Sequence, residues 1–383
     1  MIPHNNRRGN KTLPPPIKES SPTRQIISIH PFLDMNNHLV IMAGGVGSRF
    51  WPMSTEETPK QFIDVLGVGK TLIQLTMERF RGICPPENVW VVTNARYVSQ
   101  VHAQLPEVPM ENILSEPCRR NTAPCICYVS WRIKTCDPKA NIVIAPSDHV
   151  VMDTPEFQRV IRSALKFTSE SDAIVTLGMK PSRPETGYGY IQADLTAPTV
   201  RNKEIFPVES FREKPDKETA TRYISQNNYF WNAGIFVWSV ETIVNAFRLY
   251  APTINRIFES LAPVYATPDE QKEIDRLYPE CENISVDYAI MEKVEEIYVH
   301  PAEFGWSDVG TWGSLWTLTP HDQNGNTCLG ENITMVESEG CIVHTTEERR
   351  VVIQGLKDYI VAEKNNTLLI FRKSDEQRIK NFI

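Results

Sequence analysis

Residues 38–62 read HLVIMAGGVGSRFWPMSTEETPKQF, in which an apolar strand runs into a glycine turn that is followed by an arginine and a lysine. Glycines have no side chain that would keep a nucleotide away from the backbone, so the N–H groups of such a turn can point at phosphate oxygens. Arg49 and Lys60 add positive charge beside the turn. The stretch therefore predicts a strand whose end carries a phosphate-binding loop.

The sequence around this stretch alternates short apolar runs with amphipathic segments of helical length. We expect strands at 38–43, 88–93, 141–145 and 173–178, and helices at 71–83, 121–134 and 155–168. This alternation is typical of βαβ units. The predicted class is therefore α/β, with a Rossmann-like mixed, mostly parallel sheet flanked by helices.

The helix expected at 155–168 illustrates the pattern. Thr154 can cap it and Pro155 suits its first turn. One face carries the apolar residues Phe157, Val160, Ile161, Ala164 and Phe167. We expect that face to cover one side of the sheet.

The rest of the chain divides into three predicted parts. Residues 1–34 hold six prolines and few apolar runs, so we expect a disordered extension, with Met35 as a candidate true start. A catalytic domain is expected at 35–318, with aromatic-rich strands over 185–240 and helices over 241–293. Short strands over 327–372, followed by a polar helix, predict a small β-rich C-terminal domain at 319–383.

Composition limits the function classes. A net charge of -7 argues against a nucleic-acid binder, because neutralising many phosphates requires a basic face. No apolar run approaches the length that spans a membrane. The eight cysteines include no Cys-x-x-Cys pair, so we interpret them as free thiols and expect a cytoplasmic protein.

Two common phosphate motifs are incomplete here. Gly-x-Gly-x-x-Gly fails because Phe50 stands where the third glycine should be, so a dinucleotide-dependent oxidoreductase is not indicated. Gly69-Lys70-Thr71 resembles the end of a P-loop, but Asp64 replaces the required earlier glycine. Lys70 and Thr71 are therefore predicted only to begin a helix.

The glycine turn with Phe50-Trp51-Pro52, followed by Pro59-Lys60-Gln61-Phe62, resembles the opening motif of the sugar nucleotidyltransferases, in the form found in mannose-1-phosphate guanylyltransferases. Six further motifs occur in the order of that family. They are EPCRRNTAP at 116–124, PSDH at 146–149, ETGYGYI at 185–191, FREKP at 211–215, WNAG at 231–234 and WSDVGTW at 306–312. The resemblance covers residues 38–372.

The resemblance implies a set of site residues. The catalytic candidates are Arg49, Lys60, Asp148 and Asp308. The nucleotide-binding candidates are Ala43, Gly44, Gly45, Gly47, Ser48, Arg49, Lys60, Glu116, Arg120, Asn121, Thr122 and Ser147. The sugar-phosphate-binding candidates are Gly187, Tyr188, Gly189, Glu213, Lys214 and Asn232.

Several of these residues have ordinary structural alternatives. Asn121 or Thr122 could cap the helix at 121–134, and Glu213 with Lys214 could be a solvated charge pair. We interpret His149 as a structural hydrogen-bonding residue. Phe304, Trp306, Trp312 and Trp316 are expected to be mostly core, with Trp306 near the hexose.

Asp148 follows an apolar strand at the sheet edge where open α/β folds bind ligands. Asp308 offers a second carboxylate, and Mg²⁺ in proteins typically takes one or two carboxylates together with phosphates and water. The resemblance makes both residues metal ligands, so Mg²⁺ is the expected cofactor. The attacking sugar phosphate is already anionic, so positioning and charge neutralisation should suffice without a protein base.

The resemblance implies GTP and mannose 1-phosphate as substrates, and GDP-mannose and diphosphate as products. Because the chain is acidic and has no long apolar run, we expect neither nucleic acid nor membrane as a partner. Another hexose 1-phosphate or nucleotide remains an alternative, as does a catalytically silent nucleotide-sugar sensor. Guanine could be selected by Glu116 or by backbone carbonyls.

The strands around 342–352 resemble a β-structured tail that is often a solenoid, and often used for self-association, in related proteins. A homodimer is therefore one arrangement that remains open. No metal cluster of the isomerase half found in longer relatives follows, so we expect a monofunctional chain.

Overall fold

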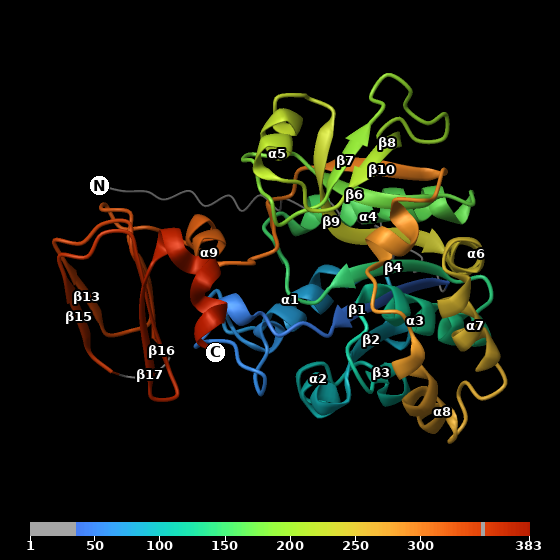
Figure 1. The fold of residues 1–383 in the computed structure, drawn as a ribbon, viewed down its shortest axis with the longest axis horizontal. Helices are drawn as coiled ribbons and strands as arrows, with labels where there is room; N and C mark the ends of the chain where they lie inside the picture. The colour runs from blue at the N-terminus through green and yellow to red at the C-terminus, as the bar shows by residue number, and fades with distance from the viewer. Residues whose placement is uncertain (1–35, 346–348) are drawn as a thin grey trace, which may run out of the picture. The chain divides into compact units, whose positions relative to one another are not determined.

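The computed structural model describes residues 36–345 and 349–383, which belong to one compact unit spanning Leu33–Ile383. The extension expected at 1–34, with its candidate start at Met35, lies outside the described residues. Figure 1 shows a large sheet with helices on its faces, and a separate group of C-terminal strands.

The main sheet has nine strands in the order β3-β2-β1-β4-β9-β6-β10-β8-β7. The strands are β1 (Asn37–Ala43), β2 (Val89–Asn94), β3 (Ile113–Glu116), β4 (Asn141–Pro146), β6 (Ile174–Met179), β7 (Tyr190–Ala193), β8 (Phe206–Arg212), β9 (Tyr229–Ser239) and β10 (Ile297–Ala302). β8 and β9 run against the direction of the others. The predicted mixed, mostly parallel α/β sheet is confirmed.

Helices cover both faces of this sheet. One face packs against α1 (Leu72–Arg79), α2 (Val98–Gln104) and α4 (Thr154–Ser169), and the other against α3 (Thr122–Cys136), α6 (Val240–Tyr250), α7 (Pro252–Ser260) and α8 (Glu270–Leu277). Successive side chains of a strand point to opposite faces, so Leu39 and Ile41 of β1 enter one core and Val40 enters the other. The run of apolar residues in β1 therefore reflects burial on both sides.

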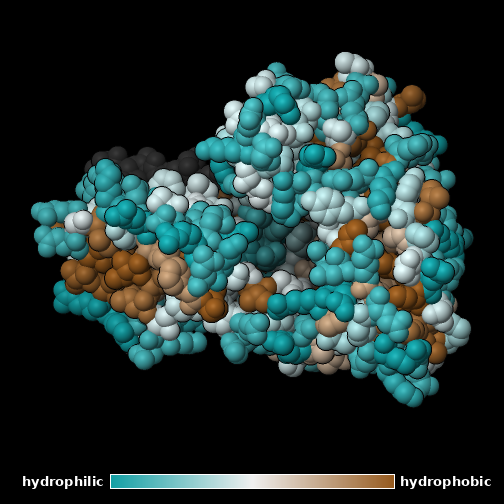
Figure 2. Space-filling model, viewed as in Figure 1, coloured by the Kyte–Doolittle hydropathy of each residue, from teal (hydrophilic) through white to brown (hydrophobic). Residues whose placement is uncertain are grey.

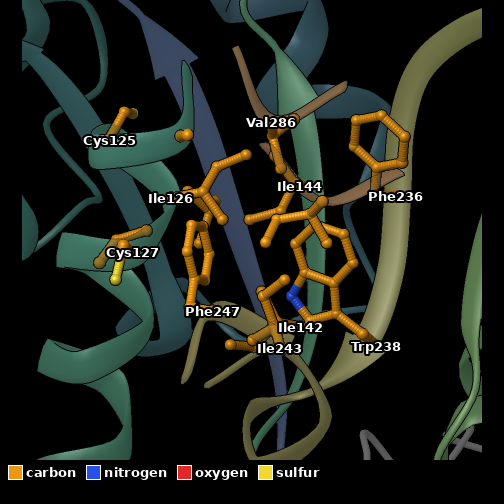
Figure 3. Packing of buried hydrophobic residues seen from close by; sticks show 14 of the residues in the cluster. Cys125, Ile126, Cys127, Ile142, Ile144, Phe236, Trp238, Ile243, Phe247 and Val286 are labelled. Carbon is orange, nitrogen blue, oxygen red and sulfur yellow. The ribbon is translucent and has the colours of Figure 1, made fainter. Parts of the chain in front are cut away.

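Figure 3 shows the core on the α3 and α6 side. Ile142 and Ile144 of β4 and Trp238 of β9 face Ile126 and Phe247 from the two helices. All five side chains are fully buried. This packing holds β4, and hence the loop that follows it, against a rigid layer.

Several elements differ from the sequence prediction. Thr154 does not cap α4, because Asp153 is the cap and its carboxylate accepts from the Glu156 N–H; the predicted apolar face of that helix is buried as expected. The elements that were not predicted include β3, α2, α5 (Lys217–Ile224) and β10. In α5 only Ala220 is buried, so no apolar periodicity marks the helix. Thr71 caps α1 in a capping box with Gln74, as expected for a helix start.

The C-terminal strands form two small sheets. The first has the order β12-β14-β16-β17 and the second pairs β13 with β15. The strands are β12 (Thr327–Leu329), β13 (Ile333–Val336), β14 (Ile342–Thr345), β15 (Val351–Gln354), β16 (Tyr359–Lys364) and β17 (Thr367–Arg372), and the polar segment after them is a 3₁₀ helix, η8 (Lys373–Phe382). All pairs except β16–β17 are parallel, which is the pattern of a small solenoid. The domain boundary at 318/319 stays a prediction.

The two parts of the compact unit share a core. Phe50 and Leu72 pack in one cluster with Trp312 of α9 (Trp312–Leu318) and with Ile342 and Ile360 of the C-terminal strands. The Lys364 ammonium also donates to the Met53 carbonyl at 2.6 Å. The residues after the glycine turn are therefore held partly by the C-terminal strands.

None of the eight cysteines is joined to another in a disulfide bond. Within 36–345 and 349–383, no helix has both the length and the apolar composition to cross a bilayer.

Candidate active site

The glycine turn begins where β1 ends, beside the end of β4. Its carbonyl groups are held from below, because the Gln61 amide donates to Ala43 O at 3.1 Å and to Gly45 O at 3.0 Å. No described residue accepts a hydrogen bond from the N–H groups of Gly45, Val46 or Gly47. The turn thus has open donors at a sheet edge where phosphates bind.

Gly47 is required for the contact between the turn and Lys60. Its φ is +72°, and a Cβ atom at this position would lie 2.5 Å from Lys60 Cβ. The Lys60 N–H donates to Val46 O at 3.2 Å. A side chain at residue 47 would therefore both strain the backbone and displace Lys60.

The Lys60 ammonium is the junction of the site. Its side chain is only 4% exposed, and Nζ lies 2.8 Å from Asp148 Oδ2. The same Nζ donates to Asp308 O at 2.8 Å and to Val309 O at 3.0 Å. Three acceptors use the three donors of an ammonium, so Lys60 joins the glycine turn to both candidate carboxylate segments.

Arg49 reaches the same segment from the other side of the turn. Its Nη1 lies 3.5 Å from Gly310 O, a long contact that leaves the guanidinium largely exposed. Arg49, Lys60, Asp148 and Asp308 are therefore brought to one place, although they are spread over most of the chain.

The carboxylates of Asp148 and Asp308 differ in the protein groups that they already contact. Burial alone would raise the pKa of Asp148, but attraction to Lys60 outweighs it, and the pKa is lowered overall. Asp308 Oδ1 accepts from the Tyr188 hydroxyl at 2.6 Å and from the Gly310 N–H at 2.9 Å. No described residue donates to Asp308 Oδ2. One carboxylate oxygen is therefore available to a ligand.

These residues fit a hard divalent cation that is shared with a substrate. The Asp148 carboxylate and the Asp308 backbone carbonyl both contact Lys60, and the side chains of both residues offer oxygen ligands. No group of three or more His, Cys, Asp or Glu side chains suited to a metal occurs among the described residues. The remaining ligands would therefore have to be phosphate oxygens and water.

His149 lies next to the candidate metal ligands but is not one of them. Trp306 Nε1 donates to His149 Nδ1 at 3.2 Å, so this nitrogen is unprotonated. Burial lowers the pKa of His149, which favours the neutral ring. The structural interpretation of His149 accords with this arrangement.

A cavity of about 230 Å³ opens beside Asp308. The predicted residues that line it are Thr122, Gly187, Tyr188, Gly189, Glu213, Asn232 and Asp308. Trp306 lines it too, whereas Phe304 and Trp312 are core. The predicted sugar-binding residues, with the exception of Lys214, are thus gathered around one cavity.

The close packing of the cavity explains one of its glycines. A Cβ on Gly189 would lie 2.5 Å from Glu213 Oε2. The Asn232 N–H in turn donates to Gly189 O at 2.9 Å. A side chain at residue 189 would therefore displace Glu213 and crowd the Cβ of Asn232, which would lie 3.3 Å away.

Asp287 lines the same cavity and was not predicted from the sequence. Its Oδ1 accepts from the Asn232 side-chain amide at 3.1 Å. Burial raises the pKa of Asp287 to about 6, and the Glu213 carboxylate adds to the shift. The residue begins a π-helix, Asp287–Met291, an element frequent at functional sites. The available signal was a single acid in an otherwise apolar stretch that we interpreted as helix.

Glu116 lies at the end of β3, beside the start of the glycine turn. A Cβ on Gly44 would be 3.4 Å from Glu116 Oε2, and the Tyr278 hydroxyl donates to Glu116 Oε1. Burial raises the pKa of Glu116 to about 7, although the Tyr278 hydrogen bond opposes the shift. A buried acceptor therefore faces the region next to the phosphate loop.

Asn121 and Thr122 are occupied with local structure. The Asn121 side chain caps α3, and the Thr122 hydroxyl accepts from the Val286 N–H at 2.9 Å. Capping was one of the two alternatives that the sequence left open, and it leaves Thr122 on the cavity wall.

Arg120, Ser147 and Lys214 are among the predicted residues that do not line the cavity. Arg120 donates to Pro279 O at 2.6 Å, and Ser147 is buried with its N–H donating to Met42 O at 3.1 Å. Lys214 is exposed and lies 2.5 Å from Glu213 Oε1. A role for any of them in binding would require movement or backbone contacts.

The chain is similar to known proteins in sequence and in structure. The family model described as Nucleotidyl transferase matches residues 38–325. The chain is 35% identical to a mannose-1-phosphate guanylyltransferase of Escherichia coli, over 90% of this chain and 74% of that protein. It is 34% identical to the alginate biosynthesis protein AlgA of Pseudomonas fluorescens, over 90% of this chain and 70% of that protein.

A solved structure is similar along nearly the whole chain. It is described as a mannose-1-phosphate geranyltransferase from Thermus thermophilus, with a TM-score of 0.81 and 29% identity. The match covers 91% of this chain and 98% of that structure.

We expect Gly47→Ala to destabilise the protein more than Gly67→Ala does. Gly67 has nearly the same φ, +68°, but no atom lies within 4 Å of the place that a Cβ would take, so its substitution costs only backbone strain of about 1 kcal/mol. Gly47→Ala adds the collision with Lys60. Urea unfolding of both variants measures the difference, and equal losses would show that Lys60 yields without cost.

Proposed function

We propose that this chain, which belongs to the nucleotidyl transferase family, joins GTP to mannose 1-phosphate, making GDP-mannose and releasing diphosphate. The chain is a nucleotidyltransferase with relatives named mannose-1-phosphate guanylyltransferase along most of its length. The observation that carries the proposal is the Lys60 junction, which joins an open phosphate loop to two carboxylate segments.

The reaction requires two polyanions to be held together. The N–H groups of the glycine turn, with Arg49 and Lys60, are proposed to hold the triphosphate. The sugar phosphate then attacks the α-phosphorus in line with the departing diphosphate. Since the nucleophile is already anionic, no side chain needs to take its proton, and His149 keeps its structural role.

The family typically uses a divalent cation, and we propose Mg²⁺ held by Asp148 and Asp308. When bound, the cation would neutralise charge that develops on the phosphates. Tyr188 and Gly310 hold the Asp308 carboxylate in place from one side.

The hexose is proposed to occupy the cavity beside Asp308. Glu213, Asp287 and Asn232 offer acceptors to sugar hydroxyl groups. Lys214 is proposed to contact the sugar phosphate. The Lys214 side chain is 59% exposed in its ion pair with the nearly buried Glu213, so its ammonium is free to turn toward a substrate phosphate.

Guanine is proposed to bind near Glu116. The N1 and N2 groups of guanine both donate, and an ionised carboxylate only accepts. The carboxylate is already buried and oriented by Tyr278, which would reduce the cost of ordering it. Arg120, Asn121 and Ser147 remain proposed neighbours of the nucleotide, by resemblance.

The direct experiment measures diphosphate release with four nucleoside triphosphates against mannose, glucose and N-acetylglucosamine 1-phosphates. GTP with mannose 1-phosphate should be the preferred pair. A preference for UTP or dTTP, or for another hexose, would replace the proposed substrates while keeping the reaction class. No release with any pair would favour the silent sensor.

We expect Asp148→Asn to lower kcat on the order of a hundredfold or more, because it removes a charged oxygen ligand and the partner of Lys60. Circular dichroism should remain that of the parent protein. Asp153→Asn is the matched control, since asparagine also caps helices and Asp153 is outside the cavity. Full activity of Asp148→Asn would contradict the metal assignment.

We expect the KM for GTP to rise as the pH falls below about 7. Glu116, whose pKa burial raises to about 7, is ionised above that pH and carries a proton below it. Below that pH the carboxyl group must lose its proton before both of its oxygen atoms can accept hydrogen bonds from guanine. This requirement weakens GTP binding by up to about tenfold per pH unit.

The control for this measurement is Glu116→Gln. The triphosphate of GTP titrates in the same way in measurements on the parent protein and on the variant. Only the difference between their two pH profiles therefore reports on Glu116. The variant should bind GTP more weakly at pH 8 and lose the extra pH dependence. Identical profiles would place guanine elsewhere.

We also propose a homodimer formed through the C-terminal strands, and a cytoplasmic location. Leu368 and Ile370 of β17 are 60% and 53% exposed. Ile370 pairs with Val361, whose side chain packs against the sheet of β13 and β15. The sheet of β13 and β15 has two strands, whereas the sheet that contains β17 has four. The smaller sheet therefore leaves the face of β17 uncovered. Figure 2 shows brown, apolar side chains gathered over these strands.

In sedimentation velocity, we expect the parent protein to be a dimer and the double variant Leu368→Glu, Ile370→Glu to be a monomer, because charges on the uncovered face oppose burial. Val200→Glu, at an exposed position of the main domain, is the matched control. A monomeric parent protein would contradict this assignment.

A further inference from the structure

We propose that a second cavity, here called the rear cavity, binds an organic phosphate monoester and that its occupant regulates the active site. The rear cavity has a volume of about 630 Å³ and lies between α1 and β5 (Val150–Val151). None of the residues predicted to bind substrate lines it. Its volume is typical of sites for small organic molecules.

Arg79 is the main reason to expect an anion there. It lines the rear cavity, yet the residue is only 5% exposed. Its Nη2 donates to Thr76 Oγ1 at 2.9 Å and to His149 O at 2.5 Å, while Nε donates to Leu75 O at 3.3 Å. Every one of these acceptors is uncharged.

The positive charge of Arg79 thus has no direct counter-ion. No described carboxylate lies within 4 Å of its guanidinium, and Nη1 donates to no described residue. The Phe157 ring, whose centroid lies 5.8 Å from Arg79 Cζ, and the negative charge of Asp148 partly stabilise the guanidinium. Asp148, however, is bound directly by Lys60. A buried charge is rarely left without a partner. An anionic ligand would supply one.

The charges around the rear cavity favour a dianion. Lys70 and Arg81 also line it, against the single acid Glu78. Glu78 accepts from Lys70 at 2.7 Å. With Arg79 the balance is two positive charges, which a phosphate monoester would neutralise.

The apolar wall indicates that the phosphate carries an organic group. Leu66, Leu75 and Val150 line the rear cavity beside the charged residues. Inorganic phosphate would leave most of the volume and all of this wall unused. An organic body on the phosphate would bury the wall.

The rear cavity shares a wall with the active site. Arg79 holds the carbonyl of His149, the residue after Asp148. β5 lines the rear cavity and pairs with β11 (Trp306–Ser307), which directly precedes Asp308. An occupant that draws Arg79 from the His149 carbonyl would therefore disturb both carboxylate segments. We expect its binding to lower kcat.

The test is calorimetric titration of the full chain with phenyl phosphate, with and without GTP, whose own binding is measured in the same way. Phenyl phosphate should bind in both cases, at least tenfold more tightly than inorganic phosphate. GMP and glucose 6-phosphate serve as further probes. The one that binds more tightly indicates whether the natural ligand of the rear cavity is a nucleotide or a sugar phosphate.

Two variants test the location. Arg79→Gln removes the buried charge, and Val68→Trp fills the rear cavity from an exposed loop position, where misfolding is not expected. Both should weaken phenyl phosphate binding at least tenfold. Arg96→Ala, an exposed basic residue elsewhere, should leave it unchanged. Absence of binding, loss of binding in the presence of GTP, or unchanged binding in both variants would overturn the proposal.

The kinetic arm rests on the proposed function. Phenyl phosphate should lower kcat for diphosphate release at least twofold in the parent protein but not in Val68→Trp. Binding without any effect on kcat would overturn the regulatory role. If no substrate pair reacts at all, the proposed function fails, whereas the calorimetric result still decides the binding site.

Discussion

The structure of the site depends on one buried ammonium group. Lys60 is almost inaccessible to water, so its charge must be matched within the protein. It is matched by the Asp148 carboxylate and by the carbonyl groups of Asp308 and Val309. Because these acceptors lie at the end of β4 and after β11, a single side chain fixes the position of two distant segments relative to the glycine turn. Removing the Asp148 carboxylate would leave the Lys60 ammonium buried without a counter-ion.

The requirements of this junction explain the residues around it. Gly47 has no side chain because Lys60 Cβ occupies the place where one would be. Gln61 holds the carbonyl groups of the turn, which leaves its N–H groups for a ligand. The C-terminal strands contribute as well, since Lys364 binds the Met53 carbonyl just beyond the turn. The loop that would bind phosphate is therefore held from three directions.

Burial also controls the acids around the site. Asp148, next to Lys60, has a lowered pKa, whereas burial raises the pKa of Glu116 and of Asp287. Attraction to Lys214 does not offset the effect of burial on Asp287. The same fold thus favours the ionised form of one carboxylate and makes two others easier to protonate. Such divergence is common where acids serve different ligands. Here the difference in pKa separates Asp148, the candidate metal ligand, from Asp287 and Glu116, the candidates for binding sugar hydroxyl groups and guanine.

The sequence by itself determined the class of the fold and the identity of most candidate residues. Alternating apolar runs are a local property, and the glycine turn followed by Arg49 and Lys60 carries its chemistry within one short stretch, residues 38–62. Only the tertiary structure decided which residues meet. The contact of Lys60 with Asp308 joins positions 248 residues apart. Asp287 and Arg79 went unnoticed for the same reason, because the burial that makes a single charge significant comes from packing against distant elements, and no local pattern records it.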